Sequence, residues 1–274
     1  MTVAVVTDST AYLPEGLAAE RGITVVPLQV TMGDRTALEG VDLTPAEFAR
    51  WITGAGRRAT TSQPTPAAFE AAYDACGASE VVAVHLSAKL SGTASAAAAA
   101  AGDRTLRVVD SGQTGMGLGF AALAAADSAA KGGSIDEVAA AAEQAAARTR
   151  TLFYVDTLEY LRRGGRIGAA AALVGTALSV KPLLHIADGA IAPLEKVRTA
   201  SKAIARLEEL AVAEGGGGRV SVAVHHLASA DRAAALADRL RARLDLDAFY
   251  VTEVGAVVGA HTGPGMLAVV VHRH

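Results

Sequence analysis

The stretch HLSAKLSGT, residues 85–93, combines three hydroxyl side chains, one ammonium group and one glycine. It follows an apolar run typical of a strand and precedes an alanine-rich run typical of a helix that begins near Ala94. Backbone N–H groups and the positive end of such a helix favour an anionic ligand, which makes Ser91 and Gly92 candidate contacts. The alternative is that Ser91 or Thr93 only caps the helix. The spacing matches neither a P-loop nor the G-x-S-x-G nucleophile elbow.

A second hydroxyl cluster lies in TTSQPT, residues 60–65. Thr65 and the proline after it predict the start of a helix, so the hydroxyls of Thr60, Thr61 and Ser62 are not needed as caps. They are therefore free to bind a ligand. The alternative is a hydroxyl-rich turn that faces water.

The third candidate is His261, which follows a long strand-like run and lies within GAHTGPG, residues 259–265. The glycines allow the backbone to approach a ligand closely, and Pro264 stiffens the turn. The alternative is a structural histidine whose hydrogen bonds are satisfied within the fold. His225 and His226 have weaker claims, and no H-x-x-x-H or C-x-x-C pattern predicts a metal site.

A basic motif, LRRGGRI at residues 161–167, groups Arg162, Arg163 and Arg166 around two glycines. Glycine after a short helical run is typical of a helix end. In a chain of negative net charge, the grouping predicts a docking surface for an acidic partner. The alternative is an ordinary solvated basic turn.

The elements that must position these motifs follow two patterns. In the first half, short β-branched runs alternate with helical segments, which predicts βαβ units and a mostly parallel sheet. These runs are VAVV (3–6), ITVVPLQV (23–30), VVAVHL (81–86) and LRVVD (106–110). Asp8 and Asp110 follow two of them at the same sheet edge as Ser91, where such acids often only cap the next turn.

From about residue 150 fewer helical stretches separate the strand-like runs, which predicts more antiparallel pairing. We therefore expect two domains. Residues 1–149 form a three-layer α/β/α domain with a mostly parallel sheet, and residues 150–274 form an α/β domain with a mixed or antiparallel sheet. A ligand is expected between the domains or at the carboxyl ends of the first sheet.

Composition narrows the class of protein. The 274 residues carry a formal charge of −3, and the absence of a global basic field argues against nucleic-acid binding. Hydrophobic residues make up 51% and aromatic residues only 4%, so we expect an aliphatic core. The single cysteine, Cys76, excludes an intramolecular disulfide, and no leader or membrane-spanning run is expected. Together these features predict a soluble, cytoplasmic protein.

Seven motifs, in this order and at this spacing, resemble the DegV family, to which the fatty-acid-binding subunits of bacterial fatty acid kinase belong. They are TDST, TTSQPT, HLSAKLSGT, VVDSG, YLRRGGRI, PLLHIADGAIAPLEKVRT and GAHTGPGML, and they run from end to end of the chain. Two departures are Ala88, where serine is common in the family, and Ala94-Ser95, which replace a tyrosine-containing continuation. Neither departure removes a proposed ligand contact.

The resemblance implies a two-domain α/β protein that encloses one long-chain fatty acid and presents its carboxylate to a separate ATP-dependent kinase subunit, which makes acyl phosphate. The chain would then be a carrier without cofactor or metal, not itself an enzyme, and its product can pass transiently to a membrane acyltransferase. The carboxylate contacts that the resemblance implies are Thr61, Ser62, Ser91, Gly92 and His261.

Serine, threonine and histidine, with no arginine in the same motifs, can orient a carboxylate while leaving it nucleophilic. The rival hypothesis is a serine hydrolase with Ser91 as nucleophile and His261 as base, which needs an acid such as Asp8 or Asp110 to orient the histidine. A third hypothesis is a sensor of a soluble messenger.

Overall fold

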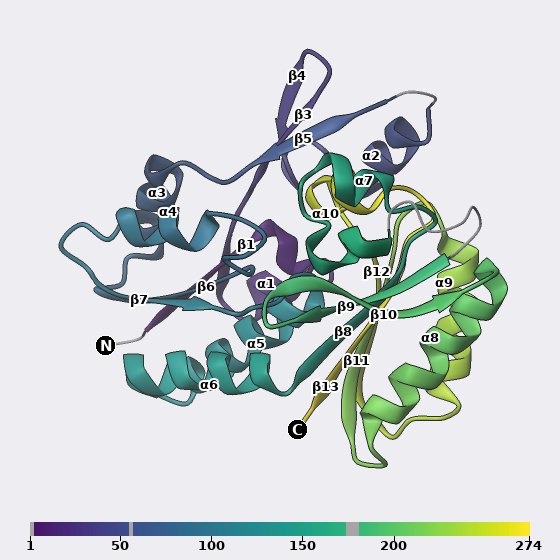
Figure 1. Cartoon of the computed structure of the whole chain (residues 1–274). Helices are drawn as coiled ribbons and strands as arrows, with labels where there is room; N and C mark the ends of the chain where they lie inside the picture. Colours follow the sequence, from purple (N-terminus) through teal and green to yellow (C-terminus); the bar gives the residue numbers. More distant parts are fainter. Residues whose placement is uncertain (1–2, 55–56, 174–180) are drawn as a thin grey trace.

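The computed structural model describes residues 3–54, 57–173 and 181–274, and its N-terminal half is built on a parallel four-stranded sheet (Figure 1). The strand order is β2-β1-β6-β7, and all neighbours are parallel. The strands are β1 (Ala4–Asp8), β2 (Ile23–Val26), β6 (Glu80–His85) and β7 (Thr105–Asp110).

Helices cover both faces of this sheet. They are α3 (Pro66–Cys76) and α4 (Thr93–Ala99) on one face, and α5 (Met116–Ala130) and α6 (Ile135–Ala147) on the other. Successive residues of a strand point to opposite faces, so Val5 packs towards α5 and α6 while Val6 packs towards α3 and α4. The predicted three-layer α/β/α arrangement is confirmed. Short elements η1 (Ser9–Ala11) and α1 (Leu17–Glu20) connect β1 to β2.

The run at residues 23–30, predicted as one strand, is in fact two strands in different sheets. Pro27 lies between β2 and β3 (Gln29–Met32) and has no N–H to continue a hydrogen-bonded ladder. β3 pairs antiparallel with β4 (Arg35–Leu38) and β5 (Ala59–Ser62). This small sheet and α2 (Pro45–Ile52) extend away from the parallel sheet (Figure 1), and Thr61 lies on β5.

Helix starts follow the local sequence. At α2 the Thr44 hydroxyl accepts from the Glu47 N–H while the Glu47 carboxylate accepts from the Thr44 N–H, which is a capping box. Ser134 and Glu137 do the same at α6. The Thr65 hydroxyl caps α3, as predicted, so the hydroxyls before it are indeed not used for that purpose.

The C-terminal half is built on a mixed six-stranded sheet of order β10-β9-β8-β13-β11-β12, in which β11 and β12 are parallel and the other described neighbours are antiparallel. Its strands are β8 (Thr149–Tyr154), β9 (Lys181–Ala187), β10 (Ala190–Val197), β11 (Val220–His226), β12 (Leu246–Glu253) and β13 (Leu267–Arg273). The predicted mixed or antiparallel sheet is confirmed. The domain division at residues 149 and 150 stays a prediction.

Helices α8 (Ala200–Gly215) and α9 (Ala230–Arg241) cover one face of the six-stranded sheet. The other face meets the N-terminal half, where Met116 and Phe120 of α5 pack on Ala223 and Val270. The remaining helical elements are α7 (Glu159–Arg163), η2 (Gly168–Leu173) and α10 (Ala256–Thr262). α10 packs against α2, α7 and β5, which brings the C-terminal part of the chain beside the small sheet (Figure 1).

Candidate functional site

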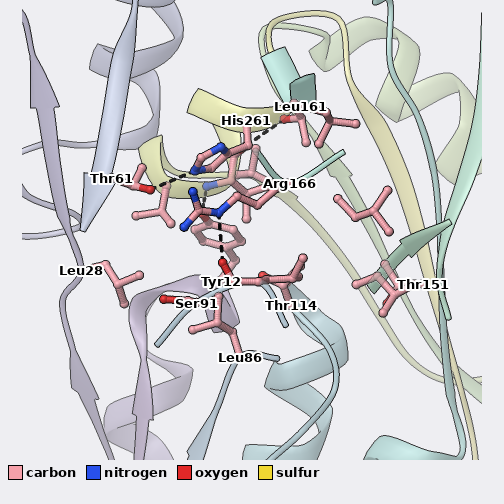
Figure 2. Close-up of a pocket in the computed structure, with 18 of the residues that line it drawn as sticks. Tyr12, Leu28, Thr61, Leu86, Ser91, Thr114, Thr151, Leu161, Arg166 and His261 are labelled. Atoms are coloured by element: carbon pink, nitrogen blue, oxygen red, sulfur yellow. Dashed lines mark hydrogen bonds between the residues drawn. The ribbon is translucent and has the colours of Figure 1, made fainter. Parts of the chain in front are cut away.

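A pocket of about 280 Å³ lies between the two halves of the chain (Figure 2). Most of its wall is apolar and includes Leu28, Leu86, Phe153, Ile186, Ile191 and Met266. Polar side chains gather in one part of it, which we call the head cluster: Thr61, Ser91, Arg166 and His261. An apolar cavity with a few convergent polar groups is suited to a ligand with a long apolar part and one polar end.

Thr61 and His261 meet although 200 residues separate them in the chain. Thr61 lies on β5 opposite Val30 of β3, and His261 lies in the last turn of α10. Thr61 Oγ1 and His261 Nε2 are 2.9 Å apart and share a hydrogen bond (Figure 2). The prediction that His261 lies in a glycine-rich turn directly after a strand is wrong, because the residue belongs to the short helix α10.

Burial and, secondarily, the positive charge of Arg166 lower the pKa of His261 to about 4. The imidazole is therefore neutral at pH 7, and the charge of the head cluster comes from Arg166. His261 Nδ1 is buried and has no hydrogen-bond partner among the residues that the structure describes. Within residues 3–54, 57–173 and 181–274, no carboxylate is hydrogen-bonded to this ring, in contrast to the histidine of a hydrolytic triad.

The Ser91 hydroxyl is not a helix cap. α4 begins at Thr93, its N-cap residue is Gly92, and no side chain caps it. Ser91 Oγ lies 2.9 Å from Thr93 Oγ1, and Ser91 is only partly buried at the pocket wall. The hydroxyl therefore belongs to the pocket wall, and the capping alternative does not hold.

Gly92 and Ser62 line the same pocket. A side chain on Gly92 would meet the carboxamide of the exposed Gln63, so Gln63 would have to move to accommodate it. Ser62 is exposed, and its hydroxyl lies 3.4 Å from Gln29 Oε1. Gln63 also lines the pocket. It was not among the predicted contacts, although it adjoins Ser62 in the sequence.

The three arginines of residues 161–167 separate in space. Arg162 and Arg163 are exposed and pair with Glu159 at 2.8 and 2.5 Å. Arg166 instead enters the pocket, where its Nε donates to the Leu90 carbonyl at 3.1 Å and its Nη1 donates to the Gly164 carbonyl at 2.7 Å. The sequence did not predict this position, because Arg166 is far from the hydroxyl motifs in the chain. The docking role of the arginines stays a prediction.

The strand-end acids are structural. Asp8 accepts hydrogen bonds from the Thr10 and Leu86 N–H groups and lies 3.0 Å from His85 Nδ1, with no exposed surface. Asp110 accepts from the Ala88 and Gly112 N–H groups. In the part of the chain that the structure describes, neither acid forms a hydrogen bond or ion pair with His261, which removes both as partners of a hydrolytic base.

His225 lines the pocket but is satisfied within the fold. Its Nε2 accepts from the Met116 N–H at 2.9 Å, and its Nδ1 lies 2.8 Å from Thr252 Oγ1. Burial lowers the pKa of His225 to about 4, so the ring is neutral. Among residues 3–54, 57–173 and 181–274, no group of three or more His, Cys, Asp or Glu side chains could hold a metal ion.

α10, which carries His261, is held at its other end by a buried carboxylate. Glu39 is 4% exposed and accepts hydrogen bonds from the Val257 N–H at 2.8 Å, the Tyr12 hydroxyl at 3.0 Å and the Ser9 hydroxyl at 2.5 Å. Burial is the main cause that raises the pKa of Glu39 from 4.5 to about 7. No sequence motif pointed to this residue.

Replacing Glu39 with glutamine should flatten the pH dependence of stability. Between pH 4.5 and about 7 the folded carboxyl keeps a proton that the unfolded chain releases, so the contribution of Glu39 to stability is largest below pH 4.5 and is lost as the pH rises through about 7. The fall amounts to about 3 kcal/mol. Urea unfolding of both proteins at pH 5 and pH 8 measures it. An identical pH dependence in the two proteins would show that Glu39 does not titrate in this way.

Replacing Gly164 with alanine should displace His261, because a Cβ at Gly164 would collide with the imidazole. The backbone of Gly164 is ordinary right-handed helix, so this contact is the main obstacle. We expect ligand affinity to fall about tenfold or more, as expected for the loss of one hydrogen bond to a charged group. The same substitution in a His261→Ala background should cost little, and equal losses in both backgrounds would contradict the collision.

Comparison with known proteins identifies the same family that the sequence motifs resemble. A family model described as "Uncharacterised protein, DegV family" matches residues 2–274. A DegV domain-containing protein of Streptomyces coelicolor is 57% identical over 98% of each chain, and protein DegV of Bacillus subtilis is 37% identical over 98% of each chain.

Solved structures agree as well. A DegV family protein from Thermus thermophilus, described for its fatty acid binding, is 34% identical and superimposes over 100% of both chains with a TM-score of 0.92. DegV of Bacillus subtilis, described as a fatty acid binding protein, gives 36% identity and a TM-score of 0.91 over 100% of both chains. With a family model and relatives that match almost from end to end, the chain belongs to the DegV family.

Proposed function

We propose that the chain binds one long-chain fatty acid in the pocket and presents its carboxylate to a separate ATP-dependent kinase subunit. The observation that carries this proposal is the apolar pocket with Thr61, Ser91, Arg166 and His261 gathered in one part of it. DegV relatives whose structures are described as binding fatty acids support it.

Affinity comes mainly from the tail. At about 0.8 kcal/mol per buried CH₂, a sixteen-carbon chain contributes roughly 11 kcal/mol before the costs of ordering and association. The apolar wall formed by both halves of the chain supplies the surface for this burial. Specificity for an acid comes from the head cluster, where one guanidinium and neutral hydroxyl and imidazole groups meet the carboxylate.

The head cluster orients a carboxylate without clamping it. Two donors of Arg166 are already committed to the Leu90 and Gly164 carbonyls, which leaves only its remaining Nη hydrogens for a ligand. The hydroxyls of Thr61 and Ser91 add neutral hydrogen bonds. A carboxylate oxygen held in this way keeps lone pairs for attack on the terminal phosphorus of ATP, which the partner subunit supplies. The exposed Arg162 and Arg163 are the proposed docking contacts.

The hydrolase hypothesis has little geometric support. In the described part of the chain, the Ser91 hydroxyl is bonded to Thr93 and the His261 Nε2 to Thr61, and no hydrogen bond joins Ser91 to His261. The unpartnered His261 Nδ1 lacks the acid that a triad requires. A serine-directed fluorophosphonate should therefore leave Ser91 unlabelled, whereas rapid stoichiometric labelling would favour the hydrolase.

Native mass spectrometry of protein purified from a bacterial host tests the binding function. We expect a mass shift of about one long-chain fatty acid per chain, because an apolar pocket of this kind retains a buried tail. The shift should disappear under denaturing conditions, and solvent extraction should release the acid. Empty protein that also fails to take up added long-chain acids would contradict the proposal.

A further inference from the structure

A second depression, of about 430 Å³, shares Thr61, Arg166 and His261 with the fatty acid pocket. Its lining brings together arginines from two segments far apart in the chain. We call this depression the arginine basin and define it by Arg57, Arg58, Arg163 and Arg166. Thr61 and His261, which share a hydrogen bond, therefore lie on the boundary between the mainly apolar pocket and the arginine basin.

The basin carries positive charge that the fold does not neutralise. Its lining contains four arginines and no carboxylate. Within residues 3–54, 57–173 and 181–274, no carboxylate lies within ion-pair distance of Arg57, Arg58 or Arg166, and Arg57 instead stacks 5.3 Å over the Trp51 ring. Arg163 forms an ion pair with Glu159, which also forms an ion pair with Arg162. Most other described arginines of the chain are paired with acids.

The position of the arginine basin, next to the proposed carboxylate site, indicates which ligand it can bind. A carboxylate bound at Thr61 and His261 lies at the wall that both cavities share. When a carboxylate oxygen forms a bond to the terminal phosphorus of ATP, the bond from that phosphorus to its bridging oxygen breaks and ADP leaves with the electron pair. The new phosphate is attached directly to the bound carboxylate, so it must lie within a few bond lengths of this wall.

We propose that the arginine basin binds the phosphate group of the acyl phosphate product while the acyl chain stays in the apolar pocket. This inference rests on the proposed function. Guanidinium groups match phosphate oxygens in geometry and charge, and four of them around one depression suit a dianion better than a single carboxylate. The same chain would then carry both the substrate and the product.

The test compares two ligands on purified protein: hexadecanoic acid and a long-chain 2-oxoalkyl phosphonate, a stable mimic in which CH₂ replaces the bridging oxygen. The variant is the double replacement Arg57→Gln and Arg58→Gln, since neither residue lines the fatty acid pocket. Arg162→Gln is the matched control, because Arg162 is exposed, belongs to the same basic motif as Arg163 and does not line the basin.

We expect the double variant to lose at least tenfold in affinity for the phosphonate and less than twofold for the fatty acid, while Arg162→Gln changes neither. The loss should shrink at high salt. Equal affinity of wild type and double variant for the phosphonate, or an equal loss for both ligands, would overturn the inference. The inference would also be overturned if inorganic phosphate bound to the fatty-acid-loaded protein with the same affinity as the phosphonate. Failure of the wild type to bind either ligand would instead overturn the proposed function itself.

Discussion

Replacing Arg166 with glutamine lowers the affinity for a long-chain fatty acid about 10- to 150-fold, the range expected when a hydrogen bond to a charged group is lost. Of the residues that the structure describes, Arg166 is the one lysine or arginine that lines the pocket. The pKa of His261, lowered to about 4, leaves that ring uncharged at neutral pH. The carboxylate therefore loses its main electrostatic partner. Isothermal titration with hexadecanoic acid measures the loss.

Two controls separate charge recognition from general damage. Arg162→Gln removes an equivalent charge from an exposed position paired with Glu159 and should keep wild-type affinity. The methyl ester of the same acid has no charge, so its weaker binding should change little between wild type and Arg166→Gln. Unchanged affinity for the free acid in Arg166→Gln would show that the carboxylate binds elsewhere.

Replacing Ala268 with phenylalanine is the second change for which we expect a large effect. Ala268 lies on β13 opposite Phe153 of β8, is 3% exposed and lines the apolar wall. A phenyl ring there fills space that the acyl tail needs. If it displaces four methylenes, binding of a sixteen-carbon acid weakens by about 3 kcal/mol, or roughly 150-fold.

The matched variant is Ala268→Val, which adds less volume and should give a smaller loss. Shorter acids should lose less affinity than the sixteen-carbon acid in Ala268→Phe, so the preference moves towards shorter chains. Thermal unfolding checks that the fold survives, since overpacking a core can cost about 1–3 kcal/mol. Wild-type affinity for the sixteen-carbon acid in Ala268→Phe would place the tail elsewhere.

Local signals predicted much of the fold. The capping boxes at Thr44 and Ser134 involve residues three positions apart, so their sequence spacing is enough to identify them. The parallel sheet follows from β-branched runs separated by helices. The break at Pro27 was overlooked because the apolar residues on both sides look continuous, although the proline cannot donate to the ladder. The run before His261 was ambiguous because short apolar stretches suit helix and strand alike.

The site was only partly predictable. Thr61, Ser91 and His261 stand in recognisable motifs, and the structure brings all three to one pocket. Arg166 stands in a motif that looked like a surface turn, and its entry into the pocket depends on how α7 packs beside α10. Glu39 has no local signal at all, because its role arises from contacts with residues 30 positions before it and 218 after it.

A crystal structure of the protein with 16-bromohexadecanoic acid tests the central claim most directly, because anomalous scattering locates the bromine independently of the carboxylate. We predict the carboxylate within hydrogen-bond distance of Thr61 or Ser91 and beside Arg166, with the bromine among apolar wall residues such as Phe153 and Ile186. Bromine at the head cluster, or no ligand in the pocket after soaking at saturating concentration, would contradict the account.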